Sequence, residues 1–249
     1  MTSFLPERHY PNAPITEAVI DLAVVFAPDA DVSVESLEQL SDVAFPASEP
    51  VIFNHVQVSG SNTAAVRRDH VGTRFRSADG LYVYQARTNG FGLSRLAPYQ
   101  NWAAFRSEAR RLWSKYREAT KPISLQRLGL RYINRIEIPL PVDDFADYFL
   151  TGPQLSPHLP QGLSSYLLNL TVPVDGLITA TITQAILNPE AVPALKRDAL
   201  PMLLDIDVSQ TLALPTDENA LWECFEQLRK VKNHVFESCI TDKARELFQ

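Results

Sequence analysis

Apolar and polar positions alternate along nine stretches of the chain, in the pattern that is typical of strands with one buried face. The predicted strands cover residues 15–26, 51–59, 70–77, 81–88, 91–96, 125–139, 166–172, 177–187 and 202–212. Asp79-Gly80 and Asn89-Gly90 separate three of these strands, and such dipeptides favour tight hairpin turns. The region 51–96 is therefore predicted to be a meander.

A helical repeat of apolar positions replaces the alternation in two long segments, 99–120 and 218–239. Two shorter helices are predicted over 33–45, which begins at the N-cap residue Ser33, and over 142–150, which has acidic residues near its start. Thr241 is expected to cap a last short helix over 242–248.

The order of these elements repeats once along the chain. Residues 12–121 and 122–249 each contain a strand, a short helix, a meander and a long helix, although the two sequences are not visibly similar. The order predicts an α+β fold in which residues 1–249 form one globular unit. Its duplicated halves are expected to form one antiparallel sheet with the two long helices on one face.

Charged residues share one face of several predicted strands. In 125–139 the alternation places Arg127, Arg131 and Arg135 together, opposite the apolar positions. The same reasoning pairs Glu17 with Asp21, Asp205 with Asp207, and Arg74 with Arg76. Two interpretations remain open: a lattice of ion pairs on a solvated sheet face, or an arginine-lined groove for an anion, a peptide or a nucleotide.

Composition narrows the class of protein. The formal net charge is −6 and the pI is about 5.4, which makes nucleic acid an unexpected partner. Cys224 and Cys239 lie fifteen positions apart in one predicted helix, roughly 22 Å, too far for a disulfide. Free thiols and an N-terminus without an apolar signal core favour a cytoplasmic protein.

Residues 150–189 carry a single formal charge, Asp175, but their prolines and polar residues indicate loops and strands. We therefore expect no membrane span.

No motif assigns a reaction. The chain lacks GxGxxG, a Walker A loop, GxSxG, HExxH and CxxC. We predict no cofactor, no metal site and no catalytic residue. Asp205 and Asp207 form a lone DxD, which is a weak metal signal. His234 lies beside the apolar stripe of its predicted helix and is expected to be a helix-surface or boundary residue.

Four blocks resemble a sporadically distributed prokaryotic family of uncharacterised proteins: YPNAPITEAVID (10–21), SRLAPYQNWAAF (94–105), RLGLRYINRI (127–136) and HVFESCIT (234–241). The resemblance implies no activity. It directs attention to Arg95, Tyr99, Arg131, Tyr132, Asn134 and Arg135. Its patchy distribution implies an accessory gene, such as one of a phage-defence or toxin–antitoxin system. Asn134, on the apolar face, is expected to join its strand to the helix start near Tyr99.

Three functions follow as hypotheses. The first is a non-enzymatic binding or interaction protein with a protein partner or a second copy of itself, acting through the polar sheet face or the neutral region 150–189. The second is a sensor of a small anion or nucleotide. Its ligand-binding candidates are Arg127, Arg131, Arg135, Arg95 and Tyr99. The third is a metal-dependent hydrolase or nuclease that uses Asp205, Asp207, Glu17 or Asp21.

Overall fold

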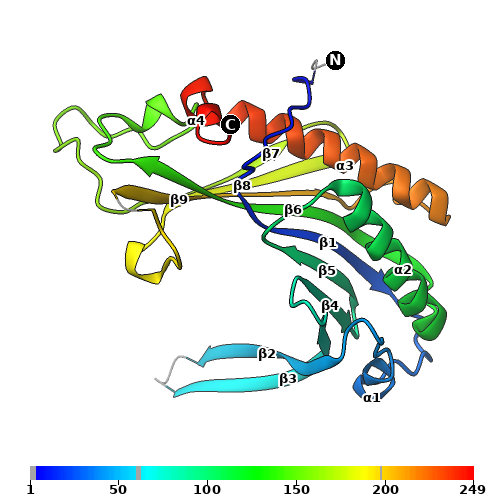
Figure 1. Ribbon diagram of the computed structural model, residues 1–249. Helices are drawn as coiled ribbons and strands as arrows, with labels where there is room; N and C mark the ends of the chain where they lie inside the picture. The colour runs from blue at the N-terminus through cyan, green and yellow to red at the C-terminus, as the bar shows by residue number, and fades with distance from the viewer. Residues whose placement is uncertain (1–3, 60–62, 197) are drawn as a thin grey trace. The chain divides into compact units, whose positions relative to one another are not determined.

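The computed structural model has an α+β fold, as predicted. It describes residues 4–59, 63–196 and 198–249. Within these ranges, the side chains of residues 54–59 and 63–67 are not described. The described residues form one antiparallel sheet of nine strands, in the order β2-β3-β4-β5-β1-β6-β9-β8-β7, and four α-helices (Figure 1). None of the described helices is long and apolar enough to cross a membrane.

The nine strands lie where the alternation predicts them, but those predicted over 51–59, 70–77 and 202–212 begin three to seven residues earlier. They are β1 (Ile15–Val25), β2 (Ala47–Ser59), β3 (Thr63–Arg76), β4 (Tyr82–Arg87), β5 (Gly90–Leu96), β6 (Ser124–Pro139), β7 (Leu167–Pro173), β8 (Ile178–Ile186) and β9 (Ala199–Gln210). The predicted meander is confirmed, since β2, β3, β4 and β5 pair antiparallel in sequence order.

The two long helices are present and the two short ones are much shorter than predicted. The helices are α1 (Val34–Glu38), α2 (Trp102–Thr120), α3 (Glu218–Cys239) and α4 (Asp242–Glu246). Ser33 and Thr241 cap α1 and α4 as expected. The predicted helix 33–45 is wrong beyond Glu38, and 142–150 holds only the 3-10 turn η1 (Phe145–Asp147). A second turn, η2 (Pro189–Ala191), lies between β8 and β9.

The chain divides into two compact units, and the division falls within β1 and β6. Unit 1 contains residues 1–18 and 129–249, and unit 2 contains residues 19–128. Each of the two strands therefore begins in one unit and ends in the other.

In unit 1, α3 lies along one face of the strands (Figure 1). The even-numbered positions from 130 to 138 in β6 and from 202 to 210 in β9 are buried on this side, which is the expected result of the two-residue period of a strand. The buried stripe of α3 contains Leu221, Phe225, Leu228, Val231 and Val235. The odd-numbered positions of the same strands are left on the opposite face.

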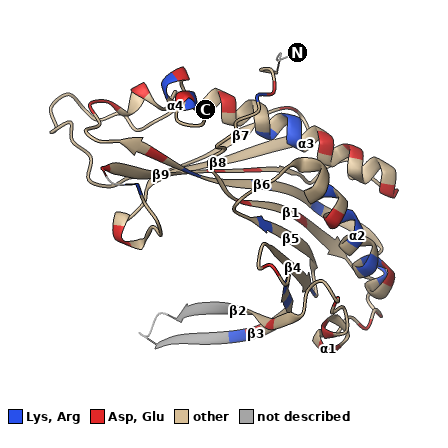
Figure 2. Cartoon of the chain, viewed as in Figure 1, with Lys and Arg blue, Asp and Glu red and all other residues tan. Residues whose placement is uncertain are grey.

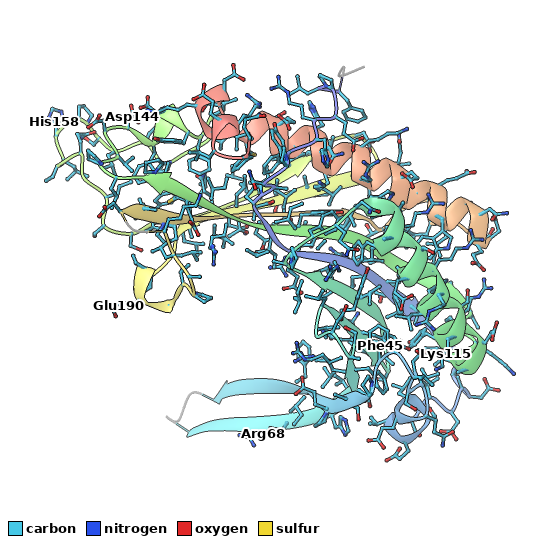
Figure 3. All side chains as sticks on the ribbon, viewed as in Figure 1. Phe45, Arg68, Lys115, Asp144, His158 and Glu190 are labelled. Atoms are coloured by element: carbon cyan, nitrogen blue, oxygen red, sulfur yellow. The ribbon has the colours of Figure 1, made fainter. Side chains whose placement is uncertain are left out.

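In unit 2, α2 covers an aromatic core. Tyr84 stacks on Phe75 at a ring distance of 5.3 Å, and Phe91 meets Trp113 of α2 edge to face. The segment after α1 is tied to α2 by Lys115, whose Nζ donates to the Ser41 carbonyl oxygen at 2.5 Å. Figure 3 labels Lys115 and the neighbouring Phe45, which is buried against Tyr84.

Candidate functional site

The three arginines of β6 lie on its less buried face, opposite the apolar positions, as the alternation predicts. Arg127 belongs to unit 2, whereas Arg131 and Arg135 belong to unit 1. Each of the three is within ion-pair distance of a carboxylate. The arginines are therefore described below in two separate clusters.

On this face of unit 1, an ion pair joins Arg131 to Asp205 of β9. Arg131 donates from Nε to Oδ1 at 2.8 Å and from Nη2 to Oδ2 at 2.5 Å, which is the two-pronged geometry that suits a guanidinium and a carboxylate. The side chain of Asp205 is only 10% exposed, and that of Arg131 is 47% exposed. Hydrogen bonding to Asp205 raises the pKa of Arg131, with further contributions from Asp207 and Glu17.

A row of neutral polar side chains extends this pair across the sheet. Thr183 of β8 is paired with Asp205, and Asn169 of β7 is paired with Thr183 and donates to its Oγ1 at 2.8 Å. A second row lies two residues further along each strand, on the same face, and consists of Thr171, Thr181 and Asp207. We call these residues, with Arg131, Arg135 and Glu137, the unit 1 polar face.

Arg135 contacts the loop between β8 and β9. Its Nη2 lies 3.0 Å from Glu137 Oε1, and its Nη1 donates to the Pro193 carbonyl oxygen at 3.2 Å. Glu137 also accepts a hydrogen bond from the backbone N–H of Lys196 at 3.4 Å. The pair therefore ties β6 to the segment that follows η2, whose Glu190 is labelled in Figure 3.

In unit 2, two arginines converge on Asp21 of β1. Arg87 of β4 donates to Asp21 Oδ2 at 2.5 Å, and Arg127 Nη1 lies 3.5 Å from Oδ1. Arg87 reaches Asp21 across Gly92 of β5, where an added Cβ would lie 3.3 Å from Arg87 Nη1 and 3.6 Å from Asp21 Oδ2. The sequence analysis missed Arg87, although it follows Gln85 at the spacing that keeps both side chains on one face of β4.

Arg95 and Tyr99, the other predicted ligand-binding residues, are engaged within the protein. Arg95 is 1% exposed and donates to the carbonyl oxygens of Leu81, at 3.2 Å, and Pro98, at 2.9 Å. Its guanidinium also lies 4.9 Å from the centre of the Tyr82 ring. The ring of Tyr99 packs edge to face on Phe105. Both residues thus stabilise the chain between β5 and α2.

Asn134 is buried, but its predicted partner is wrong. Its side-chain amide donates to the carbonyl oxygens of Tyr132, at 3.2 Å, and Leu204, at 2.9 Å. It therefore joins β6 to β9 rather than to the start of α2 near Tyr99. The sequence alone could not supply this partner because Leu204 is 70 positions away.

A second group of titratable residues, which the sequence analysis missed, surrounds α3 and the segment before β1. Tyr10 donates to Glu237 Oε1 at 2.8 Å, and Arg245 donates to Glu237 Oε2 at 2.8 Å. Lys232 Nζ lies 3.9 Å from the centre of the Tyr132 ring. His234, which is half-buried beside the apolar stripe of α3 as expected, accepts a hydrogen bond at Nδ1 from the backbone N–H of Leu5.

Burial lowers the pKa of Lys232 to about 7, and the nearby Arg229 acts in the same direction. Glu7 and Glu237 oppose this shift. Glu7 is ion-paired with Arg229 and Glu237 with Arg245. The group therefore fastens residues 5–10 to α3 with several specific contacts.

No group of three or more His, Cys, Asp or Glu side chains that could hold a metal ion occurs among the described residues. Asp205 of the DxD is hydrogen-bonded by Arg131. Cys224 and Cys239 are free thiols.

Comparison with known proteins adds no relative: no family model matches the chain, and no curated protein matches it either. The geometry of the two clusters is therefore the basis for assigning a function.

Proposed function

We propose that the protein is a non-enzymatic binding protein whose unit 1 polar face contacts another protein. The observation that carries the proposal is the mutual neutralisation of charges on this face. Arg131 is hydrogen-bonded to Asp205, and Arg135 forms an ion pair with Glu137. A receptor for a small anion keeps guanidinium groups available for its ligand, whereas these two are already paired with carboxylates.

The balance of charge on the face also suggests what kind of partner fits. Arg131 is paired with Asp205 and Arg135 with Glu137, and neutral side chains of β7 and β8 lie beside these pairs. A face whose arginines are already paired with carboxylates disfavours nucleic acid and phosphate-bearing ligands. It favours a polar protein surface, with the threonines of β8 supplying hydrogen-bonding groups between the charges.

A matched pair of arginine substitutions tests the proposal. Thr181→Arg places a large cation in the middle of the face, next to Asp207. Asn219→Arg adds the same charge at the exposed start of α3, which belongs to the other side of the strands. Both variants and the wild type are cross-linked in the native host, and the captured proteins are quantified.

The proposal expects a defined partner that the wild type and Asn219→Arg capture equally and that Thr181→Arg loses by about tenfold or more, as for a substitution at the centre of an interface. Circular dichroism confirms that both variants are folded. Equal capture by Thr181→Arg and Asn219→Arg would rule out the unit 1 polar face as the binding surface.

A sensor of small anions is a second candidate, supported by the unit 2 cluster alone. There two guanidinium groups, those of Arg87 and Arg127, converge on the carboxylate of Asp21, which is the kind of arrangement that suits an anionic ligand. A thermal-shift screen with inorganic phosphate and nucleotides tests it, because a ligand of the folded state raises the unfolding midpoint. If the protein is a sensor, a ligand should raise the unfolding midpoint of the wild type but not that of Arg127→Ala. A screen in which no ligand raises the midpoint would reject the sensor proposal.

Further proposals concern origin and setting. The element order strand, helical turn, meander, long helix occurs in both 12–121 and 122–249, which supports an internal duplication, with both long helices on one face of the sheet. The resemblance noted above supports a cytoplasmic role in a prokaryotic accessory system.

A further inference from the structure

The two edges of the nine-stranded sheet differ in how they are protected from pairing with another strand. β2, at one edge, carries Glu49 and Pro50, and its register with β3 shifts between Val51 and Ile52. A charge, a proline and a bulge are the usual means of preventing edge-to-edge association. β7, at the other edge, has the sequence LLNLTVP, with no charged residue and with a proline only at its end.

The neighbourhood of β7 is also neutral and apolar. Asp175 is the only formal charge in residues 150–189, and the loop before β7 is drawn almost entirely in tan in Figure 2. Leu167 is 74% exposed, Val172 41% and Leu177 47%. Exposed apolar side chains beside an unprotected strand edge are typical of an interaction site.

The sequence of β7 is symmetric about Leu170. Asn169 and Thr171 are the polar neighbours on either side, and Leu168 and Val172 are the apolar neighbours one step further out. An antiparallel copy turned about Leu170 therefore faces polar residues with polar residues and apolar residues with apolar residues. Leu167 and Pro173 meet at each end of the pairing.

We propose that β7 pairs antiparallel with β7 of a second copy of this chain, related by a two-fold axis at Leu170. A two-fold interface requires a surface that is complementary to itself, and the order of residues in β7 meets this condition. The neutral strand also adds no charge repulsion, although each chain has a net charge of −6. The sheets of the two copies then join into one continuous sheet, as in strand-addition complexes.

This inference deepens the proposed binding function by naming a partner for β7. Its test uses purified protein alone. A negative result would leave the proposal for the unit 1 polar face standing, and failure of that proposal would not affect the measurement of self-association.

Two double variants test the pairing by charge. Asn169→Lys with Thr171→Lys places two lysines opposite each other twice across the axis, whereas Asn169→Lys with Thr171→Glu places lysine opposite glutamate twice. Both variants lose the hydrogen bond from Asn169 to Thr183 equally. Sedimentation equilibrium should give a dimer for the wild type and a dissociation constant about tenfold or more weaker for the lysine–lysine variant than for the lysine–glutamate variant.

Cysteine cross-linking tests the register. In the proposed pairing, Leu170→Cys brings two Cα atoms to about 4.5–5.5 Å, within disulfide range. Asn169→Cys separates them by roughly 8 Å, because the two residues are offset by two positions. Oxidation should therefore give a covalent dimer for Leu170→Cys only. Native Cys224 and Cys239 are common to both variants and serve as the internal control.

Three results would each overturn the inference: a wild type that remains monomeric at all concentrations, equal dissociation constants for the two double variants, or cross-linking of Asn169→Cys as fast as that of Leu170→Cys. Circular dichroism of every variant, compared with the wild type, shows that the fold is retained, so that a loss of dimer reports on the interface.

Discussion

Individual arginines of this protein differ in exposure and in partner, although they occupy similar positions in the sequence pattern. Arg131 is half exposed and hydrogen-bonds a nearly buried carboxylate, Asp205. Arg95 is buried and donates hydrogen bonds to backbone carbonyl oxygens. The cost of removing a charged side chain depends on what remains behind: water can solvate an exposed group, but a buried unpaired one keeps its desolvation penalty.

The Arg131–Asp205 pair should therefore respond asymmetrically to substitution. Arg131→Ala leaves the Asp205 carboxylate without its guanidinium partner in a poorly solvated place, at a cost of about 1–3 kcal/mol of unfolding free energy. Asp205→Ala leaves an arginine that water can reach, at a cost below about 1 kcal/mol. Urea denaturation measures both, and the double variant should resemble Asp205→Ala. Equal costs for the two single variants would contradict this assignment.

Lys232 provides a pH-dependent prediction. Its pKa is lowered to about 7 in the folded protein, mainly by burial, and an ordinary lysine titrates near 10.4. Between these values the unfolded chain binds more protons than the folded one, so the unfolding free energy should rise with pH from about 7 to about 10. Below pH 7, Lys232 is protonated in both the folded and the unfolded state, so the full free-energy cost of burying its charge is present.

Lys232→Met removes this ionisation and keeps an unbranched side chain against Tyr132. Thermal unfolding of both proteins across pH 7–10 should show a steeper rise of the midpoint with pH in the wild type than in the variant. The neighbouring charged residues Glu7, Arg229 and Glu237 are present in both proteins, so the comparison isolates the change at Lys232. Parallel curves would mean that Lys232 titrates normally.

At the scale of elements, two glycines of β5 differ in what a larger side chain would contact. An added Cβ at Gly90, the first residue of β5, would lie 2.3 Å from the backbone oxygen of Leu22 in β1. The nearest atom to a Cβ at Gly92 is the end of the Arg87 side chain, at 3.3 Å. A flexible side chain can move, whereas a backbone oxygen within a sheet moves only if the strand moves.

Gly90→Ala should therefore lower the unfolding free energy by about 3 kcal/mol or more, as an overpacked site does, and Gly92→Ala by less than about 1 kcal/mol. Urea denaturation of the two variants under identical conditions measures the difference. Similar losses would show that β1 and β5 can separate at Gly90 without much cost.

Elements also differ in how well their sequences predict them. The apolar stripe of α3 predicts a helix over 218–239, and the helix has those bounds. The predicted helix 33–45 ends at Glu38, because Asp42 and Phe45 form an isolated bridge instead and Arg111 binds the Asp42 carboxylate. Short helices are marginal alone, so their contacts with the rest of the fold decide their length.

At the scale of the whole molecule, the distribution of charge distinguishes candidate functions better than any single residue. On the unit 1 polar face Arg131 and Arg135 are paired with carboxylates, and in unit 2 Arg87 and Arg127 converge on Asp21. The neutral region 150–189 has almost no charge at all. These surfaces therefore differ in charge, and each proposal above is tested on its own surface.

The sequence by itself determined the approximate positions of the strands, the two long helices and the face of β6 on which its arginines lie, because alternation and helical repeats are local properties. Only the tertiary structure decided which charges meet. Asp205 lies beside Arg131 because β9 is next to β6 in the sheet, although the two residues are 74 positions apart. Strand order depends on the burial of distant apolar surfaces against one another, and no local pattern encodes it.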